Sequence, residues 1–123
     1  MQLTNTEEKL MHYLWKREKA LLKELLNDFP DPKPAKTTIA TLLKRMTEKG
    51  IINYHLLGSK REYYPLIAKK EYSSSSVSKL IKNFFNNSAV QLASFCTTEN
   101  NMTEEELKEL RSIIDKQLQN KSK

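Results

Sequence analysis

The sequence predicts a mainly α-helical protein in which one β-hairpin separates two groups of three helices. Over most of the 123 residues, apolar side chains recur three and four positions apart, which is the spacing of one helix face. This period changes only after Gly50, where two runs of β-branched and aromatic residues flank a short basic segment. A chain of this length has room for one core and a small appendage.

The first helix is predicted to begin at Thr4, which forms a Thr-x-x-Glu pattern with Glu7. In such a capping box, each of the two side chains accepts a hydrogen bond from a backbone N–H of the first turn. The apolar face that follows consists of Leu10, Met11, Leu14 and Trp15.

A second helix is predicted from its own apolar face, which consists of Leu21, Leu22, Leu25, Leu26 and Phe29. Three prolines, Pro30, Pro32 and Pro34, follow this face. They end the helix, because proline has no backbone N–H and restricts the residue before it.

The third helix is predicted over Ala35–Lys49, and Gly50 ends it as a residue that adopts a left-handed conformation at little cost. Its apolar face consists of Ile39, Leu42, Leu43 and Met46. A helix turns about 100° per residue, so the opposite face is polar. That face presents Thr37, Thr41, Lys44 and Glu48, with Thr38 and Arg45 on its flank.

The hairpin is predicted from two strand-like runs, Ile51–Leu56 and Glu62–Ile67, which flank a basic tip at Leu57–Arg61. Pro65 lacks a donor for the strand ladder, which favours the outer strand of the ribbon for the second run. Three helices followed by a hairpin over residues 1–70 have the order of a winged helix-turn-helix. In that DNA-binding fold the third helix lies in the major groove.

Residues 71–123 predict three further amphipathic helices, the last of which begins with a second capping box at Thr103 and Glu106. About 50 residues are too few to enclose a stable core, so we expect these helices to form a dimerisation region with a second copy of the chain. Packing against the N-terminal domain is the alternative. The run Ser73–Ser76 is compatible with a flexible linker or with the first turn of a helix. The candidate dimerisation residues are Leu80, Ile81, Phe84, Leu107, Leu110, Ile114 and Leu118.

The positive charge is confined to one part of the chain. The formal net charge is +6, and residues 33–70 carry nine Lys or Arg against two acidic residues. A confined basic block is typical of a surface that contacts phosphate groups. A merely solvated face is the alternative interpretation.

Several other classes of protein are disfavoured by the sequence. Cys96 is the only cysteine, which excludes an internal disulfide and a cysteine-cluster metal site. Neither an apolar run long enough to cross a bilayer nor a secretory signal is seen, so we expect a soluble, cytoplasmic protein without membrane insertion. His12 and His55 have no partner residues at metal-ligand spacing, and two glycines are too few for a nucleotide-binding loop. We therefore expect neither an enzyme nor a cofactor.

The combination of motifs resembles the BlaI/MecI penicillinase-repressor family. The resemblance rests on four segments, Leu3-Thr4-x-x-Glu7, Met11-x-x-Leu14-Trp15, Thr38-Ile39-x-Thr41-Leu42-Leu43-x-Arg45-Met46-x-x-Lys49-Gly50 and Arg61-Glu62-Tyr63-Tyr64-Pro65-Leu66. It covers Leu3 to about Tyr72 by motif and the remaining residues by helix layout.

The resemblance implies a homodimeric, sequence-specific transcriptional repressor on a palindromic operator in double-stranded DNA. We expect base contacts from the outward face of the third helix and phosphate contacts from its basic residues and the hairpin tip. The base-contact candidates are Thr37, Thr38, Thr41 and Lys44, and the phosphate-contact candidates are Lys36, Arg45, Lys60 and Arg61.

The resemblance leaves the inducing signal open. In the β-lactam branch of the family, a membrane sensor with a zinc protease domain triggers cleavage of the repressor at an Asn–Phe bond. Alignment from the second capping box places that bond at Phe95–Cys96, where the residues do not match, although Cys96–Asn101 has a loop-like composition. The copper branch carries a CxCxxxxCxC tail, which this sequence lacks. A protein-interaction module and a ligand-responsive winged-helix regulator are the alternative functions.

Overall fold

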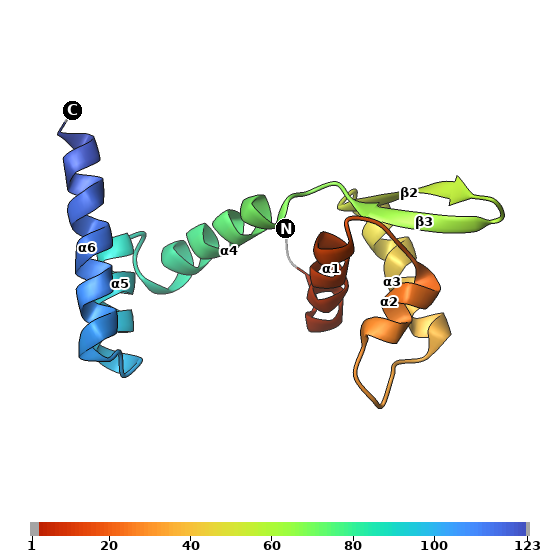
Figure 1. The fold of residues 1–123 in the computed structure, drawn as a ribbon, viewed down its shortest axis with the longest axis horizontal. Coiled ribbons are helices and arrows are strands. Elements are labelled where there is room, and N and C mark those ends of the chain that lie inside the picture. Colours follow the sequence, from red (N-terminus) through yellow and green to blue (C-terminus); the bar gives the residue numbers. More distant parts are fainter. Residues whose placement is uncertain (1–2, 123) are drawn as a thin grey trace. The chain divides into compact units, whose positions relative to one another are not determined.

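The computed structural model describes residues 3–122 and confirms the mainly helical class with a small sheet (Figure 1). The chain divides into two compact units, Met1–Ser75 and Ser76–Lys123. The elements are α1 (Asn5–Arg17), β1 (Ala20–Leu21), α2 (Leu22–Asp28), α3 (Lys36–Glu48), β2 (Ile52–Leu57), β3 (Lys60–Pro65), α4 (Lys69–Phe84), α5 (Ala89–Glu99) and α6 (Glu104–Lys121).

Helix α1 begins with the predicted capping box. The Glu7 backbone N–H donates to Thr4 Oγ1 at 3.2 Å, and the Thr4 backbone N–H donates to Glu7 Oε1 at 2.9 Å. Leu10, Met11 and Leu14 are fully buried, as the apolar spacing predicts. The local pattern therefore sets both where the helix begins and which face it buries.

The segment before α2 differs from the prediction. Ala20 and Leu21 form a short strand, and the helix begins only at Leu22, so Leu21 is not a helical residue. Strand β1 pairs with β3, with Leu21 opposite Glu62. The Leu21 backbone N–H also donates to Glu24 Oε1 at 2.8 Å, which satisfies one of the free donors at the start of α2.

The sheet has the strand order β1-β3-β2, and both pairs are antiparallel. The prediction that Pro65 lies on the outer strand is therefore wrong, because β3 is the central strand. Pro65 is tolerated because it is the last residue of β3 and lies beyond Tyr63 and Glu62, the two residues that pair with β1.

The predicted hairpin between β2 and β3 is confirmed. Its turn consists of Gly58, with φ +66°, and Ser59, so the basic residues of the expected tip are the first residues of β3.

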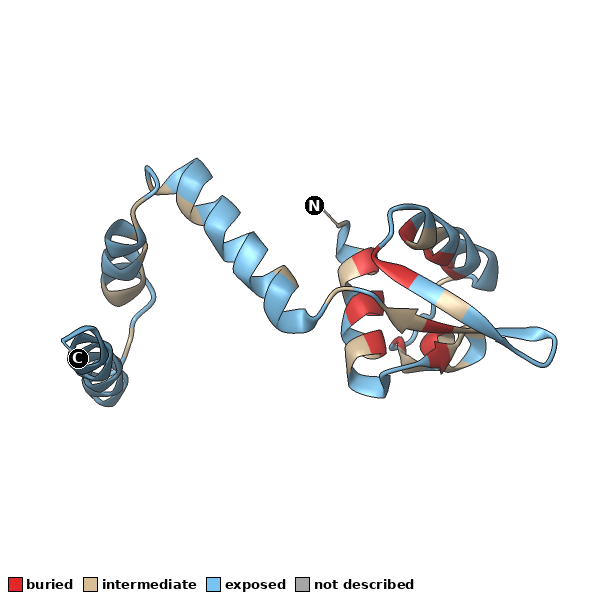
Figure 2. Cartoon of the chain, turned by 90° about the horizontal axis from the view of Figure 1, so that it is seen from above, coloured by how far each residue is buried: buried red, intermediate tan, exposed pale blue. Residues whose placement is uncertain are grey.

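The core lies entirely in the first unit, among α1, α2, α3 and the sheet (Figure 2). Helix α3 contributes three fully buried residues to it, Ile39, Leu43 and Met46. Gly50 adopts φ +80° after α3, as predicted, and places Ile51 and Ile52 in the same core.

An ion pair joins the ends of α1 and α2. Arg17 Nε donates to Asp28 Oδ2 at 2.7 Å, and Arg17 Nη2 donates to Asp28 Oδ1 at 2.8 Å. The hydrogen bond from Arg17 lowers the pKa of Asp28 and outweighs the effect of burial. The same hydrogen bond raises the pKa of the Arg17 guanidinium.

The second unit consists of helices whose described residues are all partly or fully exposed (Figure 2). Ser88 and Thr103 cap α5 and α6, and the capping box of Thr103 and Glu106 is present as predicted. Asn86, Asn87 and Asn101 have positive φ values between the helices, where asparagine is better tolerated than most residues. The Ser73–Ser76 run lies inside α4, so it is helical.

Candidate nucleic-acid interface

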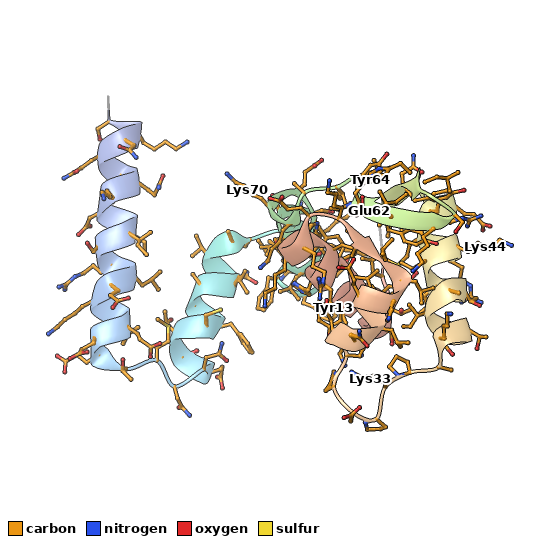
Figure 3. All side chains as sticks on the ribbon, turned by 45° about the vertical axis from the view of Figure 1, so that its right-hand side comes forward. Tyr13, Lys33, Lys44, Glu62, Tyr64 and Lys70 are labelled. Atoms are coloured by element: carbon orange, nitrogen blue, oxygen red, sulfur yellow. The ribbon has the colours of Figure 1, made fainter. Side chains whose placement is uncertain are left out.

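The outward face of α3 is polar and exposed. Because Ile39, Leu43 and Met46 are buried and Leu42 packs against the same core, the opposite face of the helix is exposed to solvent. The exposed residues include the predicted contact residues Lys36, Thr37, Thr38, Thr41, Lys44 and Arg45. Lys44 projects outward from α3 in Figure 3. The face has the small polar and basic side chains that can reach base edges in a major groove.

The hydroxyl group of Thr41 is already used within the helix. Thr41 Oγ1 donates to the carbonyl oxygen of Thr37 at 2.9 Å. This bond leaves the methyl group and an acceptor position of Thr41 for a ligand. The bonding therefore favours contact between Thr41 and an apolar group, such as the methyl group of thymine, over hydrogen-bond donation.

The hairpin tip presents two cationic side chains. Lys60 and Arg61 follow the Gly58–Ser59 turn directly, and both are exposed. The Arg61 guanidinium lies 4.5 Å from the centre of the Tyr54 ring on the neighbouring strand. This cation–π contact limits the directions that Arg61 samples while its charge stays accessible.

A cleft connects the hairpin tip to the starts of α2 and α3. Its cavity volume is about 590 Å³. Its lining contains four cationic residues and no acidic one. The lining residues are Leu21, Leu22, Lys23, Leu26, Lys36, Ser59, Lys60, Arg61 and Tyr63. The predicted phosphate-contact residues Lys60 and Arg61 at the hairpin tip therefore line the same cleft as Lys36 at the start of α3.

Lys23 is a candidate that the sequence prediction missed. It occupies the second position of α2, and it is exposed. Its place beside the hairpin follows from the pairing of Leu21 with Glu62, 41 positions along the chain. Helical periodicity could show that Lys23 faces solvent, but only the sheet register brings it close to Lys60 and Arg61.

Two lysines of the basic block, Lys33 and Lys49, form hydrogen bonds within the protein. Lys33 Nζ donates to the backbone oxygens of Asn27 at 3.1 Å and Phe29 at 2.5 Å, where it satisfies carbonyl groups at the end of α2 (Figure 3). Lys49 Nζ binds both carboxylate oxygens of Glu7. The charge count of the block therefore overstates the number of cations available to a phosphate backbone.

The second unit exposes a large apolar surface. Phe84 is 76% exposed and Leu118 is 60% exposed, although both are large apolar residues. The other predicted dimerisation residues, Leu80, Ile81, Leu107, Leu110 and Ile114, lie on α4 and α6 and are exposed or half-buried. A groove of about 660 Å³ is lined by Leu80, Phe84, Phe85, Leu92, Phe95, Cys96 and Asn100. Within the described residues, no part of α4, α5 or α6 is buried.

The segment expected to be loop-like is mostly helical. Helix α5 continues through Cys96 to Glu99, and only residues 100–103 lie between α5 and α6. The hydroxyl groups of Thr97 and Thr98 both donate to the carbonyl oxygen of Ser94 at 2.9 Å, so these polar side chains are accommodated by the helix. The Phe95–Cys96 bond therefore lies within a helix.

The two histidines have partners of other kinds. His12 contacts the Trp15 ring edge-on, with centroids 5.3 Å apart, and His55 Nε2 lies 2.7 Å from Glu62 Oε1. Among residues 3–122, no group of three or more potential ligands is arranged to hold a metal ion. No helix in the same range is sufficiently long and apolar to span a membrane.

Comparison with known proteins identifies relatives along nearly the whole chain. A model of the penicillinase repressor family matches residues 3–116. The chain is 24% identical over 115 residues to a penicillinase repressor of Bacillus licheniformis, covering 93% of this chain and 90% of that protein. It is 22% identical over 120 residues to the methicillin resistance regulatory protein MecI of Staphylococcus aureus strain N315, covering 94% of each chain. The MecI protein of Staphylococcus epidermidis gives the same identity and coverage.

Proposed function

The chain belongs to the penicillinase repressor family, and from this premise we propose that it is a homodimeric transcriptional repressor that binds a palindromic DNA operator. The family match confirms the resemblance that the sequence motifs predict. The observation that carries the finer proposal is the exposed polar and basic face of α3 beside a cationic hairpin tip. The protein then acts by occupying DNA and not as an enzyme.

The proposed contacts divide into two kinds. On α3, Thr37, Thr38, Thr41 and Lys44 read base edges in the major groove. Lys36, Arg45, Lys60 and Arg61 bind phosphates and fix the register of the protein on the duplex. We add Lys23 to the phosphate contacts, because it lines the same cleft as Lys36, Lys60 and Arg61. Phosphate contacts supply sequence-independent affinity, and the α3 contacts supply the choice of sequence.

Dimerisation is supported by the apolar surface of the second unit. Helices that bury none of their described residues cannot stabilise one another through a core. A second copy of the chain supplies a matching set of apolar residues through a two-fold interface. The two DNA-binding units of the dimer then occupy two half-sites, which raises the affinity far above that for one half-site.

Relief of repression by proteolysis is the corresponding route of induction. A cut between α5 and α6 removes Leu107, Leu110, Ile114 and Leu118 from the proposed interface without touching a DNA contact. Asn100 and Asn101 are exposed and lie outside the helices, so a protease reaches this connection more easily than the helical Phe95–Cys96 bond. A membrane sensor protease system is the upstream partner that this route implies.

Selection from random duplex DNA with the full-length protein at physiological salt tests the proposal. We expect enrichment of one palindrome whose half-sites lie about one helical turn, or a multiple of it, apart. Weak, salt-sensitive retention without enrichment would contradict the proposal and favour a protein-interaction module with a non-specific basic patch.

A further inference from the structure

The connection between the hairpin and the second group of helices is short. Strand β3 ends at Pro65 and α4 begins at Lys69, so only residues 66–68 lie between them. The first compact unit nevertheless continues to Ser75 and includes the first turns of α4. The start of α4 therefore belongs to the DNA-binding unit.

Two side chains of α1 hold this connection. Trp15 Nε1 donates to the carbonyl oxygen of Ile67 at 2.8 Å. The Tyr72 hydroxyl donates to Glu8 Oε2 at 2.8 Å. The rings of Trp15 and Tyr72 are also in contact, with centroids 5.9 Å apart. Glu8 and Trp15 are seven positions apart, which places them on one face of α1. We call Glu8, Trp15, Ile67 and Tyr72 the α1 latch.

The exposure of α4 changes directly after the latch. Tyr72 is half-buried, whereas every residue from Ser73 to Leu80 is exposed. The boundary between the two compact units follows Ser75, one turn after Tyr72. The latch contacts therefore join α1 to the segment that leads into α4 and to its first turn.

We propose that the α1 latch is a positioning element that restricts the spacing of half-sites that the dimer accepts. This inference rests on the proposed function, because it concerns a dimer with two DNA-binding units. In the proposed dimer, the two DNA-binding units are joined through the second units of the two chains. A flexible junction between the first and second units lets the DNA-binding units reach half-sites at many spacings, whereas a rigid junction lets them reach few. Residues 66–68 are too short to act as a flexible spacer while the latch is closed. Glu8, Trp15 and Tyr72 then determine which spacings of half-sites are bound, although they are not among the proposed DNA contacts.

The test compares variants on duplexes with two half-sites whose separation changes in steps of one base pair over about one helical turn. Tyr72→Phe keeps the ring and removes the hydrogen bond to Glu8, and Trp15→Phe keeps an aromatic ring and removes the hydrogen bond to Ile67. Tyr72→Ala removes the hydrogen bond to Glu8 and the ring contact with Trp15. Tyr13→Phe is the matched control, because Tyr13 lies on α1 but packs against Phe29, with ring centroids 5.0 Å apart. Affinity for a duplex with one half-site is measured in parallel.

We expect the wild-type protein and Tyr13→Phe to share one narrow optimum of spacing. Tyr72→Ala should lower the preference for the optimum over the least favourable spacing by about tenfold, while affinity for one half-site changes by less than about twofold. Tyr72→Phe and Trp15→Phe should give smaller changes in the same direction. Trp15 is the only tryptophan, so a red shift of its emission in Tyr72→Ala reports that the latch has opened.

Three outcomes would overturn the inference. If all latch variants keep the wild-type spacing preference, or if they lose affinity equally at every spacing, the latch has only a structural role and the proposed repressor function stands. If the wild-type protein prefers no duplex with two half-sites, the dimeric repressor function and the latch proposal both fail. Because Tyr72→Phe removes a single oxygen atom, it keeps the test decisive even where Tyr72→Ala fails to fold.

Discussion

Lys49 Nζ lies 3.0 Å from Oε2 and 3.2 Å from Oε1 of Glu7, an ion pair that joins the residue after α3 to the first turn of α1. Glu7 is 1% exposed and is the only buried charged residue among residues 3–122. Burial alone would raise the pKa of Glu7, but the backbone hydrogen bond from Thr4 and the hydrogen bond and charge of Lys49 together hold the pKa below its ordinary value. The ionised carboxylate therefore links α1 to the end of α3, the helix that presents the proposed DNA face.

The pKa of Glu7 predicts that the first unit is less stable in acid. A carboxyl group whose pKa is lower in the folded state stabilises that state above its unfolded pKa, and this contribution is lost as the pH falls from about 4.5 through the folded pKa. Glu7→Gln should lower the free energy of unfolding at pH 7 by about 1–3 kcal/mol. The substitution removes the ion pair with Lys49 and weakens the hydrogen bond that the Thr4 backbone N–H donates to the side chain. Its stability should also change less than that of the wild type below pH 4.5. Denaturant unfolding between pH 3 and pH 7 measures both effects. Glu48→Gln, an exposed change on α3, is the control, and equal acid dependence of Glu7→Gln and wild type would contradict the prediction.

The basic cleft predicts how DNA binding depends on salt. Lys23→Ala, Lys60→Ala and Arg61→Ala should each weaken binding to all DNA sequences and reduce the slope of log K against log salt concentration by about 0.9, the value for one phosphate contact. Titrations at several salt concentrations on the selected operator and on a random duplex measure the slope. Lys9→Ala removes an exposed charge from α1 as a control. An unchanged slope in Lys23→Ala would remove this residue from the phosphate contacts.

The outward face of α3 predicts changes in sequence preference. Lys44→Ala should cost about 1–3 kcal/mol on the selected operator and relax the preference at one position of each half-site, as expected for loss of one base contact. Repeating the DNA selection with the variant measures this change directly. Lys69→Ala, an exposed change at the start of α4, should leave the selected sequence unaltered. If Lys44→Ala selects the wild-type sequence, Lys44 is not a base-reading residue.

The exposed apolar residues of α6 predict that dimerisation and DNA affinity are lost together. Ile114→Ser combined with Leu118→Ser should give a monomer by sedimentation and lower the affinity for the palindrome by about 100-fold, because each unit then binds its half-site alone. Affinity for one half-site should be unchanged. Lys116→Ser is a control on the same helix. A monomeric variant that binds the palindrome as tightly as the wild type would contradict the proposed dimer mechanism.

A chain that ends after Ser75 gives the same prediction without the second unit. This truncation keeps the first compact unit and its latch contacts. We expect it to bind one half-site like the full-length protein and to lose at least about 100-fold in affinity for the palindrome. Tight binding of the palindrome by the truncated chain would assign dimerisation to the first unit.

Much of the fold and of the candidate site could be predicted because it depends on local rules. The capping boxes at Thr4 and Thr103 need residues only three positions apart. Which side chains of α3 face outward follows from its helical period and does not depend on what the opposite face contacts. The composition of Cys96–Glu99 was misleading, because threonine hydroxyls that donate to a backbone oxygen make a polar segment compatible with a helix.

The sequence by itself therefore determined the family, the order of helices and hairpin, and the polar face of α3. Only the tertiary structure decided what depends on residues far apart in the chain. Pairing of Leu21 with Glu62 turned part of an expected helix into a strand and brought Lys23 to the hairpin tip. Lys49 forms an ion pair with Glu7 inside the first unit, and the Tyr72 hydroxyl donates to Glu8 of the same unit. These outcomes escape a local pattern because each depends on an interaction with a residue more than 40 positions away, whether a strand pairing or a contact between side chains.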